Sequence, residues 1–139
     1  MATTRTAGAH WEGSLPEGSG SVTLESSGLG TFDLTWASRS ESPEGRTSPE
    51  ELIAAAHASC FSMALSNGLA KAGTPATSLD TSVEVDFQPG QGITAIRITV
   101  RGVVEGLDAP GFEAAAQTAK ENCPVSKALA AVPITLTVA

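Results

Sequence analysis

The sequence has no tyrosine and few other aromatic residues, with four phenylalanines and two tryptophans among 139 residues. A core with so few large rings is built from small aliphatic side chains, or it is completed by a partner subunit. The length suits one domain with a core of its own, which we expect to span residues 1–139. We find no internal repeat, low-complexity tract or linker that would divide the chain.

Basic residues are also scarce. Eight lysines and arginines face fifteen aspartates and glutamates, for a net charge of -7. Such a balance argues against non-specific binding of nucleic acid, because phosphates are held by lysine and arginine. The acidic residues are scattered along the chain, so they indicate a solvated surface rather than an acidic binding face.

Long hydrophobic segments are missing as well. No run approaches the length of a membrane-spanning helix, and the first ten residues lack the apolar stretch of a signal peptide. We therefore expect a cytoplasmic protein with no membrane partner. A reducing compartment disfavours a permanent structural disulfide, which leaves the two cysteines as inert thiols, metal ligands or redox groups.

One segment carries strong helix signals, residues 48–71. Ser48 suits the N-cap, Pro49 the first helical position, and Glu51 the closing position of a capping box. The helix is apolar on nearly all sides between residues 52 and 65, which is typical of a helix buried in a domain or in a dimer interface.

The remaining pattern alternates groups of strands with helices. The order βββ, α, ββ, αα, β predicts an α+β fold with antiparallel sheets rather than a doubly wound sheet. The strands are expected at residues 9–13, 21–25, 31–38, 83–87, 96–104 and 134–138, and the other helices at 110–121 and from 123 to about 132.

The two cysteines lie in different settings. Cys60 sits in the middle of the long helix, where free cysteine commonly behaves as a small hydrophobe and needs a nearby cation to become a reactive thiolate. Cys123 precedes Pro124 and is the expected N-cap of a short helix, where amide groups favour a thiolate. A cap without redox function is the alternative for Cys123.

His57 shares a helical face with Cys60, which raises two further kinds of site, a metal site and a hydrolase site. A metal site of His57, Cys60 and Cys123 has three ligands at best, and neither a C-x-x-C motif nor a second nearby histidine completes it. A cysteine–histidine hydrolase is disfavoured, because this helical spacing rarely directs an imidazole at the thiol. We expect no metal and no bound cofactor.

Two segments closely resemble the OsmC/Ohr family of thiol peroxidases. They are residues 48–65, which include the motif HASC, and residues 122–126, NCPVS. The HWEG motif at residues 10–13 and the closing ITL at 134–136 are similar to the OsmC branch. A histidine at position 57 also favours this branch, because Ohr proteins usually have tyrosine there.

The resemblance implies a peroxidase mechanism. Cys60 is then the thiol that attacks an organic hydroperoxide and becomes a sulfenic acid, and Cys123 is the resolving thiol that forms a disulfide with it. A dithiol donor, of lipoyl type in this family, reduces the disulfide. Phe61, Met63 and Leu65 are expected to form an apolar lining that favours organic peroxides.

The family also places an arginine and a glutamate beside the reactive thiol. These carry over to Arg39 and Glu50, with Arg46 as the alternative arginine. The resemblance further implies an intertwined homodimer with a long central helix and active sites at the subunit boundary. Two other functions stay open: a non-catalytic protein that binds an apolar small molecule, and a stress-related dimer with inert thiols.

Overall fold

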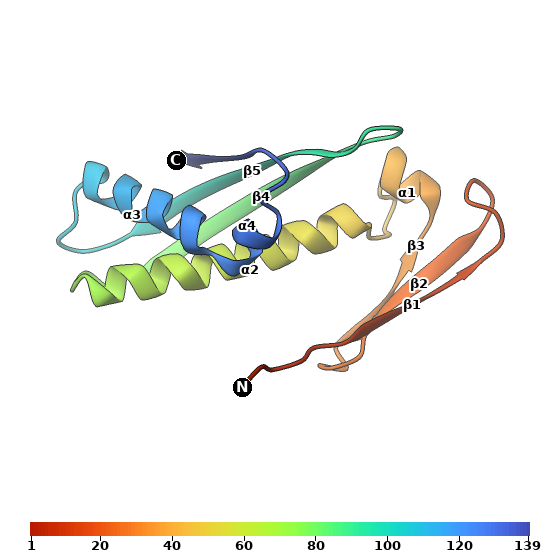
Figure 1. Ribbon diagram of the computed structural model, residues 1–139, viewed down its shortest axis with the longest axis horizontal. Helices are drawn as coiled ribbons and strands as arrows, with labels where there is room; N and C mark the ends of the chain where they lie inside the picture. Colours follow the sequence, from red (N-terminus) through yellow and green to blue (C-terminus); the bar gives the residue numbers. More distant parts are fainter. The chain divides into compact units, whose positions relative to one another are not determined.

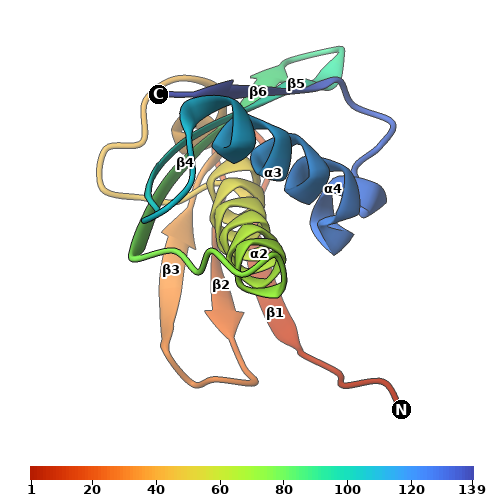
Figure 2. The same cartoon turned by 90° about the vertical axis from the view of Figure 1, so that its left-hand side faces the viewer.

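A computed structural model describes residues 1–139 (Figures 1 and 2), in two compact units, Met1–Leu52 and Ile53–Ala139. The boundary between the units falls inside the long helix, and each unit is described by itself. A single domain spanning residues 1–139 stays a prediction.

The first unit is built on a three-stranded antiparallel sheet in the order β1-β2-β3. Its strands are β1 (Ala7–Glu12), β2 (Ser19–Leu24) and β3 (Gly30–Leu34), close to the three expected strands. Apolar and polar residues alternate along them, and glycines at the turns adopt the positive φ that other residues avoid, as at Gly28 (φ 68°).

The end of the third expected strand is wrong, because it folds as a short helix, α1 (Trp36–Ser40). Thr35 and Ser38 form a reciprocal capping box: each side-chain oxygen accepts a hydrogen bond from the backbone N–H of the other, at 3.0 Å. These local hydrogen bonds start a helix where the alternation of Leu34 and Trp36 had suggested a continued strand.

Helix α2 (Pro49–Lys71) matches the expected long helix. The Ser48 hydroxyl accepts the backbone N–H of Glu51 at 3.1 Å, so the predicted N-cap is confirmed. The Glu51 carboxylate accepts the hydroxyl of Thr47 at 2.6 Å instead of closing the capping box. The helix stops before Gly73, whose φ of 86° suits a residue without a side chain.

The second unit has a three-stranded sheet in the order β4-β5-β6. Strands β4 (Ser78–Gln88) and β5 (Gly92–Val103) pair antiparallel, as expected, whereas β6 (Ile134–Val138) pairs parallel to β5. The sheet is therefore mixed. The reason is the crossover through α3 (Ala109–Asn122) and α4 (Pro124–Ala128), which returns the chain to run beside β5 in the same direction.

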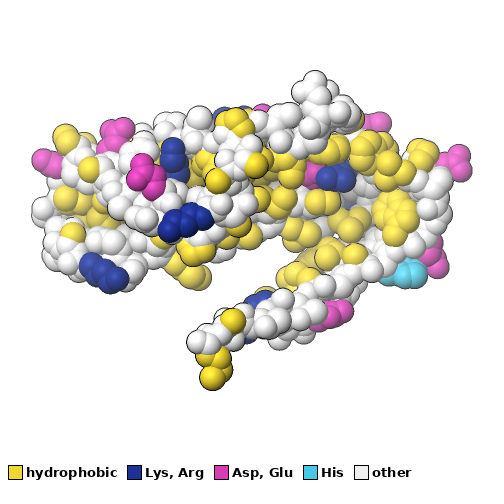
Figure 3. All heavy atoms as spheres, viewed as in Figure 1, with side chains coloured by type: hydrophobic (Ala, Val, Ile, Leu, Met, Phe, Trp, Pro, Cys, Tyr) yellow, Lys and Arg dark blue, Asp and Glu magenta, His cyan; other side chains and the backbone are white.

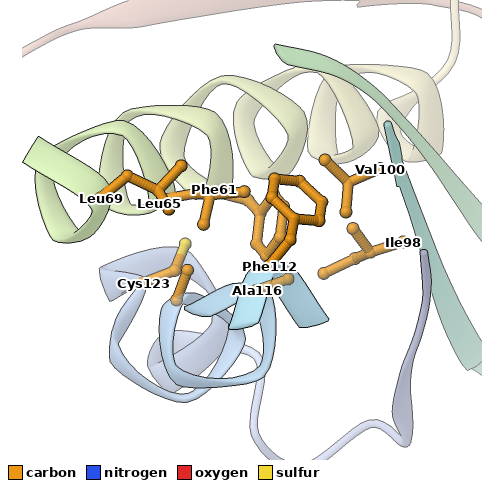
Figure 4. Packing of buried hydrophobic residues seen from close by; sticks show 9 residues of the cluster. Phe61, Leu65, Leu69, Ile98, Val100, Phe112, Ala116 and Cys123 are labelled. Atoms are coloured by element: carbon orange, nitrogen blue, oxygen red, sulfur yellow. The ribbon is translucent and has the colours of Figure 1, made fainter. Parts of the chain in front are cut away.

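Helix α3 lies beside α2 in both ribbon views, and the sheet covers the pair (Figures 1 and 2). Residues spaced by four on α2, namely Phe61, Leu65 and Leu69, point into the contact and are fully buried. Figure 4 shows them facing Phe112 and Ala116 of α3. The other members of this core include Ile98, Val100, Ala119 and Cys123.

By length and composition alone, α2 could also cross a membrane, which corrects the expectation that no segment reaches this length. A core helix of a soluble protein has the same properties. A single helix of this kind is weak evidence for a membrane span; its row of Phe61, Leu65 and Leu69 is buried in the core, and 22% of its most apolar window is buried.

Candidate functional site

The second unit brings the two cysteines together. The Sγ atoms of Cys60 on α2 and Cys123 at the start of α4 are 2.9 Å apart, and both thiols are free. A disulfide bond measures about 2.05 Å, so a small movement is enough to form one. Cys60 is partly exposed, whereas Cys123 is fully buried, with its sulfur directed at α2 (Figure 4).

The junction of two helices holds Cys123 in this position. Its backbone N–H donates to the Ala119 carbonyl at 2.8 Å and closes α3, while its own carbonyl accepts from the N–H of Lys127 at 3.0 Å and opens α4. Pro124 occupies the first position of α4, as expected, and Cys123 is the N-cap residue, although its side chain makes no capping hydrogen bond. The chain direction changes at Cys123, so its side chain turns toward α2.

Hydrogen bonds around the sulfurs shift the two thiol pKa values in opposite directions. Burial and the hydrogen bond with Cys123 raise the pKa of Cys60, against a smaller effect of the Val125 amide. Burial also acts to raise the pKa of Cys123, but hydrogen bonds from Cys60, Ser126 and Val125 outweigh it, and its pKa is lowered. Either sulfur could carry the shared hydrogen by distance, and these directions put it on Cys60.

His57 belongs to the same cluster. It is fully buried, and its Nε2 lies 2.7 Å from the Oγ of Ser126 on α4. Burial lowers the pKa of the imidazole, so the neutral ring is favoured at neutral pH. The other ring nitrogen, Nδ1, is buried without a hydrogen-bond partner. The sequence showed only that His57 and Cys60 share a face, and no local signal pointed to Ser126.

In the first unit the other two predicted site residues, Arg39 and Glu50, form an ion pair. The Nε–H of Arg39 on α1 donates to both carboxylate oxygens of Glu50, at 2.7 and 3.2 Å. Glu50 is buried in the first turn of α2, while Arg46, the alternative arginine, is exposed. The unexpected helix α1 is the element that carries Arg39. Whether this pair and the cysteines act in one site stays a prediction.

Arg39 also borders an apolar cavity of about 300 Å³ within the first unit. Both tryptophans of the chain, Trp11 and Trp36, contribute to its wall, so a guanidinium group lies at the edge of an aromatic surface. The other lining residues are Leu15, Leu34, Thr35 and Pro49.

A larger groove runs between α2 and α3 in the second unit, with a volume of about 970 Å³. Cys60 lies in its wall, and hydrophobic side chains show at the surface of this unit with lysine and arginine among them (Figure 3). Met63 lines the groove as expected, but Phe61 and Leu65 do not, because they face the core. The remaining wall is formed by Ser59, Ala64, Asn67, Gly68, Lys71, Ala72, Ala114, Ala115, Thr118, Ala119, Asn122 and Pro124.

No group of three or more histidine, cysteine, aspartate or glutamate side chains is arranged to hold a metal ion. Of the three possible ligands named from the sequence, His57 is hydrogen-bonded to Ser126, and Cys60 and Cys123 are hydrogen-bonded to each other.

Comparison with known proteins agrees with the motifs at these positions. Residues 42–138 match the family model described as OsmC-like protein. The chain is 45% identical over 126 residues to Peroxiredoxin OsmC of Escherichia coli strain K12, covering 88% of this chain and 87% of that protein. A protein of the same name from Shigella flexneri matches equally well.

Solved structures show the same fold. A crystal structure of an organic hydroperoxide resistance protein OsmC from Legionella pneumophila has a TM-score of 0.74 and 27% identity, covering 100% of this chain and 98% of that one. The Bacillus subtilis protein OhrB matches in fold with a TM-score of 0.70 at 24% identity, over 96% of this chain and 98% of its own. With a family model that spans most of the sequence and a relative at 45% identity over nearly its whole length, the chain belongs to the OsmC family.

Proposed function

We propose that the protein is a thiol peroxidase that reduces organic hydroperoxides to alcohols. The observation that carries this proposal is the approach of a partly exposed sulfur and a buried sulfur to 2.9 Å, from residues that are 63 positions apart in the chain. Two free thiols held at that distance can pass between a dithiol and a disulfide with little change in the fold. The name of the Escherichia coli relative, Peroxiredoxin OsmC, supports the same activity.

Cys60 takes the role of the attacking thiol, because it borders the groove and is the accessible member of the pair. Its thiolate attacks the O–O bond, which places one oxygen on the sulfur as sulfenic acid and releases an alkoxide. The alkoxide leaves as the alcohol with the proton that the thiol pair gives up. Two electrons pass from the sulfur to the peroxide.

Cys123 is the resolving thiol. Its thiolate attacks the Cys60 sulfur, the S–S bond forms, and the hydroxide that leaves takes a proton to become water. An external dithiol then reduces the disulfide and becomes a disulfide itself. We propose a donor of lipoyl type, since the groove beside Cys60 is open enough to admit a flexible arm.

Arg39 supplies the cation in this proposal. Within the second unit alone the charge is favoured on Cys123, so Cys60 needs a further positive group to become the nucleophile. A guanidinium group fits that need because it stays charged, and Glu50 fixes its orientation by accepting from Nε. In this proposal Arg39 and Glu50 act together: the Arg39 guanidinium stabilises the thiolate and donates to the peroxide oxygens, and Glu50 fixes the guanidinium.

The groove supports organic hydroperoxides as the substrate class. Its wall contains five alanines together with Met63 and Pro124, beside several polar residues. Each methylene of a substrate that is buried against the apolar part contributes about 0.8 kcal/mol of binding. Hydrogen peroxide has no alkyl group and gains nothing from this wall. The volume of about 970 Å³ lies at the upper end of small-molecule sites.

We also propose that the protein works as a cytoplasmic homodimer. The chain has few aromatic residues, and several large hydrophobic side chains are exposed, including Phe32, Met63 and Val103. A second copy of the chain could cover such side chains. The molar mass in solution, measured by light scattering, tests this part separately from the chemistry.

A second function uses the same groove without turnover. A protein that only binds an apolar small molecule needs the cavity but not the thiol pair. The two functions separate when reduced protein receives one equivalent of cumene hydroperoxide and its free thiols are counted. The peroxidase loses both thiols together as one intramolecular disulfide, whereas a binding protein keeps both.

The donor is tested by steady-state consumption of cumene hydroperoxide with dihydrolipoamide or with thioredoxin and its reductase. We expect sustained consumption with dihydrolipoamide and little with thioredoxin. If both thiols are lost in the single-equivalent assay but only thioredoxin sustains consumption of the peroxide, the peroxidase proposal stands and the lipoyl-type donor is wrong.

A further inference from the structure

Behind the two sulfurs lies a pair of buried polar side chains that the proposed mechanism leaves unused. His57 has none of its surface exposed and Ser126 only 5%, and the 2.7 Å hydrogen bond between them joins α2 to α4 across 69 residues of sequence. Ser126 lies three residues after Cys123, on the first turn of α4, and Ser126 is among the residues that lower the pKa of the Cys123 thiol. The same two helices thus carry two links, His57 to Ser126 and Cys60 to Cys123.

The Nδ1 atom of His57, which has no hydrogen-bond partner, indicates which ring nitrogen carries the hydrogen. One of the two ring nitrogens of a neutral imidazole carries hydrogen, and Nδ1 has no partner. A buried N–H without an acceptor is more costly than a buried lone pair without a donor, so the hydrogen belongs on Nε2. The Nε2–H then donates to Ser126 Oγ, and the Ser126 hydroxyl hydrogen is left to point elsewhere.

With its oxygen already accepting from His57, the Ser126 hydroxyl is directed to donate. An acceptor within its reach is the Cys123 sulfur, which prefers such a donor when it is a thiolate. Aligned hydrogen bonds of this kind polarise and strengthen one another in a buried setting. Without His57 the hydroxyl could rotate and lose this direction.

We propose that His57 and Ser126 form a positioning pair that fixes the first turn of α4 against α2 and so aims the Cys123 sulfur at the oxidised Cys60. The inference rests on the proposed peroxidase function only for its role in disulfide formation, since the hydrogen bond between His57 and Ser126 exists in the reduced protein. His57 touches neither substrate nor sulfur in this role and acts through Ser126.

The pair acts in one step of the reaction. Once Cys60 is a sulfenic acid, the Cys123 thiolate attacks its sulfur, the S–S bond forms, and the departing hydroxide takes a proton from solvent. Ser126 withdraws no proton and donates its hydrogen bond to the sulfur until the new bond forms. A neutral Cys123 would first have to lose its proton in a buried site, which slows this step and leaves the sulfenic acid exposed to more peroxide.

The first experiment needs no peroxide. In the Cys60→Ser variant the thiolate of Cys123 is titrated by its ultraviolet absorbance. Adding Ser126→Ala should raise the pKa of Cys123 by about one unit, the size expected for losing a hydrogen bond to a charged group, while Ser126→Thr keeps the hydroxyl and the low pKa. His57→Leu should raise it likewise, and His57→Gln, which keeps a donor near Nε2, should restore most of the effect.

The second experiment follows one turnover with both cysteines present. Rapid mixing with cumene hydroperoxide should give about tenfold slower disulfide formation from the sulfenic acid in Ser126→Ala and more sulfinic acid by mass spectrometry, with Ser126→Thr close to the parent. Equal disulfide rates and equal Cys123 pKa values in the alanine and threonine variants would overturn the positioning role. If the parent protein forms no sulfenic acid at all, the proposed function fails, while the titration still decides the role of the pair.

Discussion

Cys60 is partly exposed, whereas Cys123, whose sulfur lies 2.9 Å away, is fully buried. In the proposed mechanism a peroxide entering from the groove therefore meets Cys60 first, and Cys123 reacts only with the oxidised Cys60. Access, rather than acidity, then separates the proposed roles of the two thiols, since the hydrogen bonds of the second unit lower the pKa of Cys123, whereas burial raises that of Cys60.

Replacing the buried thiol should stop the cycle after one step. Cys123→Ser is expected to consume one equivalent of organic hydroperoxide and then stall, because no second thiol can displace the oxygen from Cys60. Mass spectrometry should show sulfenic acid on Cys60, followed by sulfinic acid when more peroxide is added.

The matched variant, Cys60→Ser, should consume no peroxide even in the first step, because its remaining thiol, Cys123, is fully buried. Repeated turnover by Cys60→Ser in the presence of dihydrolipoamide would contradict the assignment of the two roles.

The guanidinium group of Arg39 should matter beyond its charge. Arg39→Ala is expected to lower kcat/KM for cumene hydroperoxide about 100-fold, a loss typical of removing one electrostatic donor from an active site. Arg39→Lys should recover little of it, because an ammonium group cannot reproduce the planar arrangement that Glu50 orients. Arg46→Ala is the control, and a loss confined to that variant would move the role to Arg46.

Stability should depend on pH through His57. Burial lowers the pKa of the folded imidazole below 6.5, so between the two pKa values the unfolded chain holds a proton that the folded chain does not. Above about pH 6.5 the His57 ring is neutral in both states, and the free energy of unfolding does not change through this residue. It falls as the pH drops from about 6.5 toward the lower pKa of His57 in the folded protein. Urea unfolding of wild type and His57→Gln at several pH values should show the advantage of wild type shrinking below pH 6.5. A constant difference contradicts the shift.

Narrowing the groove should change substrate preference. Ala114 is exposed and lines the groove from α3, so Ala114→Phe places a ring in the space meant for an alkyl group. We expect kcat/KM for cumene hydroperoxide to fall about tenfold, the equivalent of roughly two methylenes of lost contact, with hydrogen peroxide unaffected. Ala130→Phe, an exposed alanine outside the groove, is the matched control. A parallel fall with both peroxides would place the effect on Cys60 itself.

Substitutions on the buried and on the exposed face of α2 should differ in their effect on the free energy of unfolding. Leu65 is fully buried and Met63 is 71% exposed. Leu65→Ala is expected to lower the free energy of unfolding by about 2–5 kcal/mol through the cavity it leaves, and Met63→Ala to change it by no more than about 0.5 kcal/mol. Urea denaturation gives both values. A large loss in Met63→Ala would show that another chain covers that residue.

The long elements of this fold could be predicted from the sequence because their signals are local. Ser48 and Pro49 start α2, and the alternation in β4 and β5 reports one buried and one exposed face. Helix α1 was missed because four residues of alternation fit a strand as well as a capped turn. The parallel pairing of β6 depends on the path of α3 and α4, which no pattern within β6 itself encodes.

In the candidate site, too, some residues could be predicted from the sequence and others could not. Motif resemblance pointed to Cys60, Cys123, Arg39 and Glu50, and each pair is in contact. The lining was partly wrong because a helix that is apolar on nearly all sides does not reveal which side faces the core. The partner of His57 could not be found, since Ser126 lies in another helix and its role depends on tertiary structure alone.

The distance of 63 residues between the cysteines also bears on how the protein is made. During synthesis, Cys60 leaves the ribosome well before Cys123, and the apolar row of α2 emerges before the α3 helix that covers it. For that interval the apolar row of α2 is uncovered, and Cys60 has no second thiol in the chain with which to form a disulfide. A sulfenic acid formed on Cys60 at that stage is resolved within the chain only after the C-terminal third, which holds Cys123, has been translated.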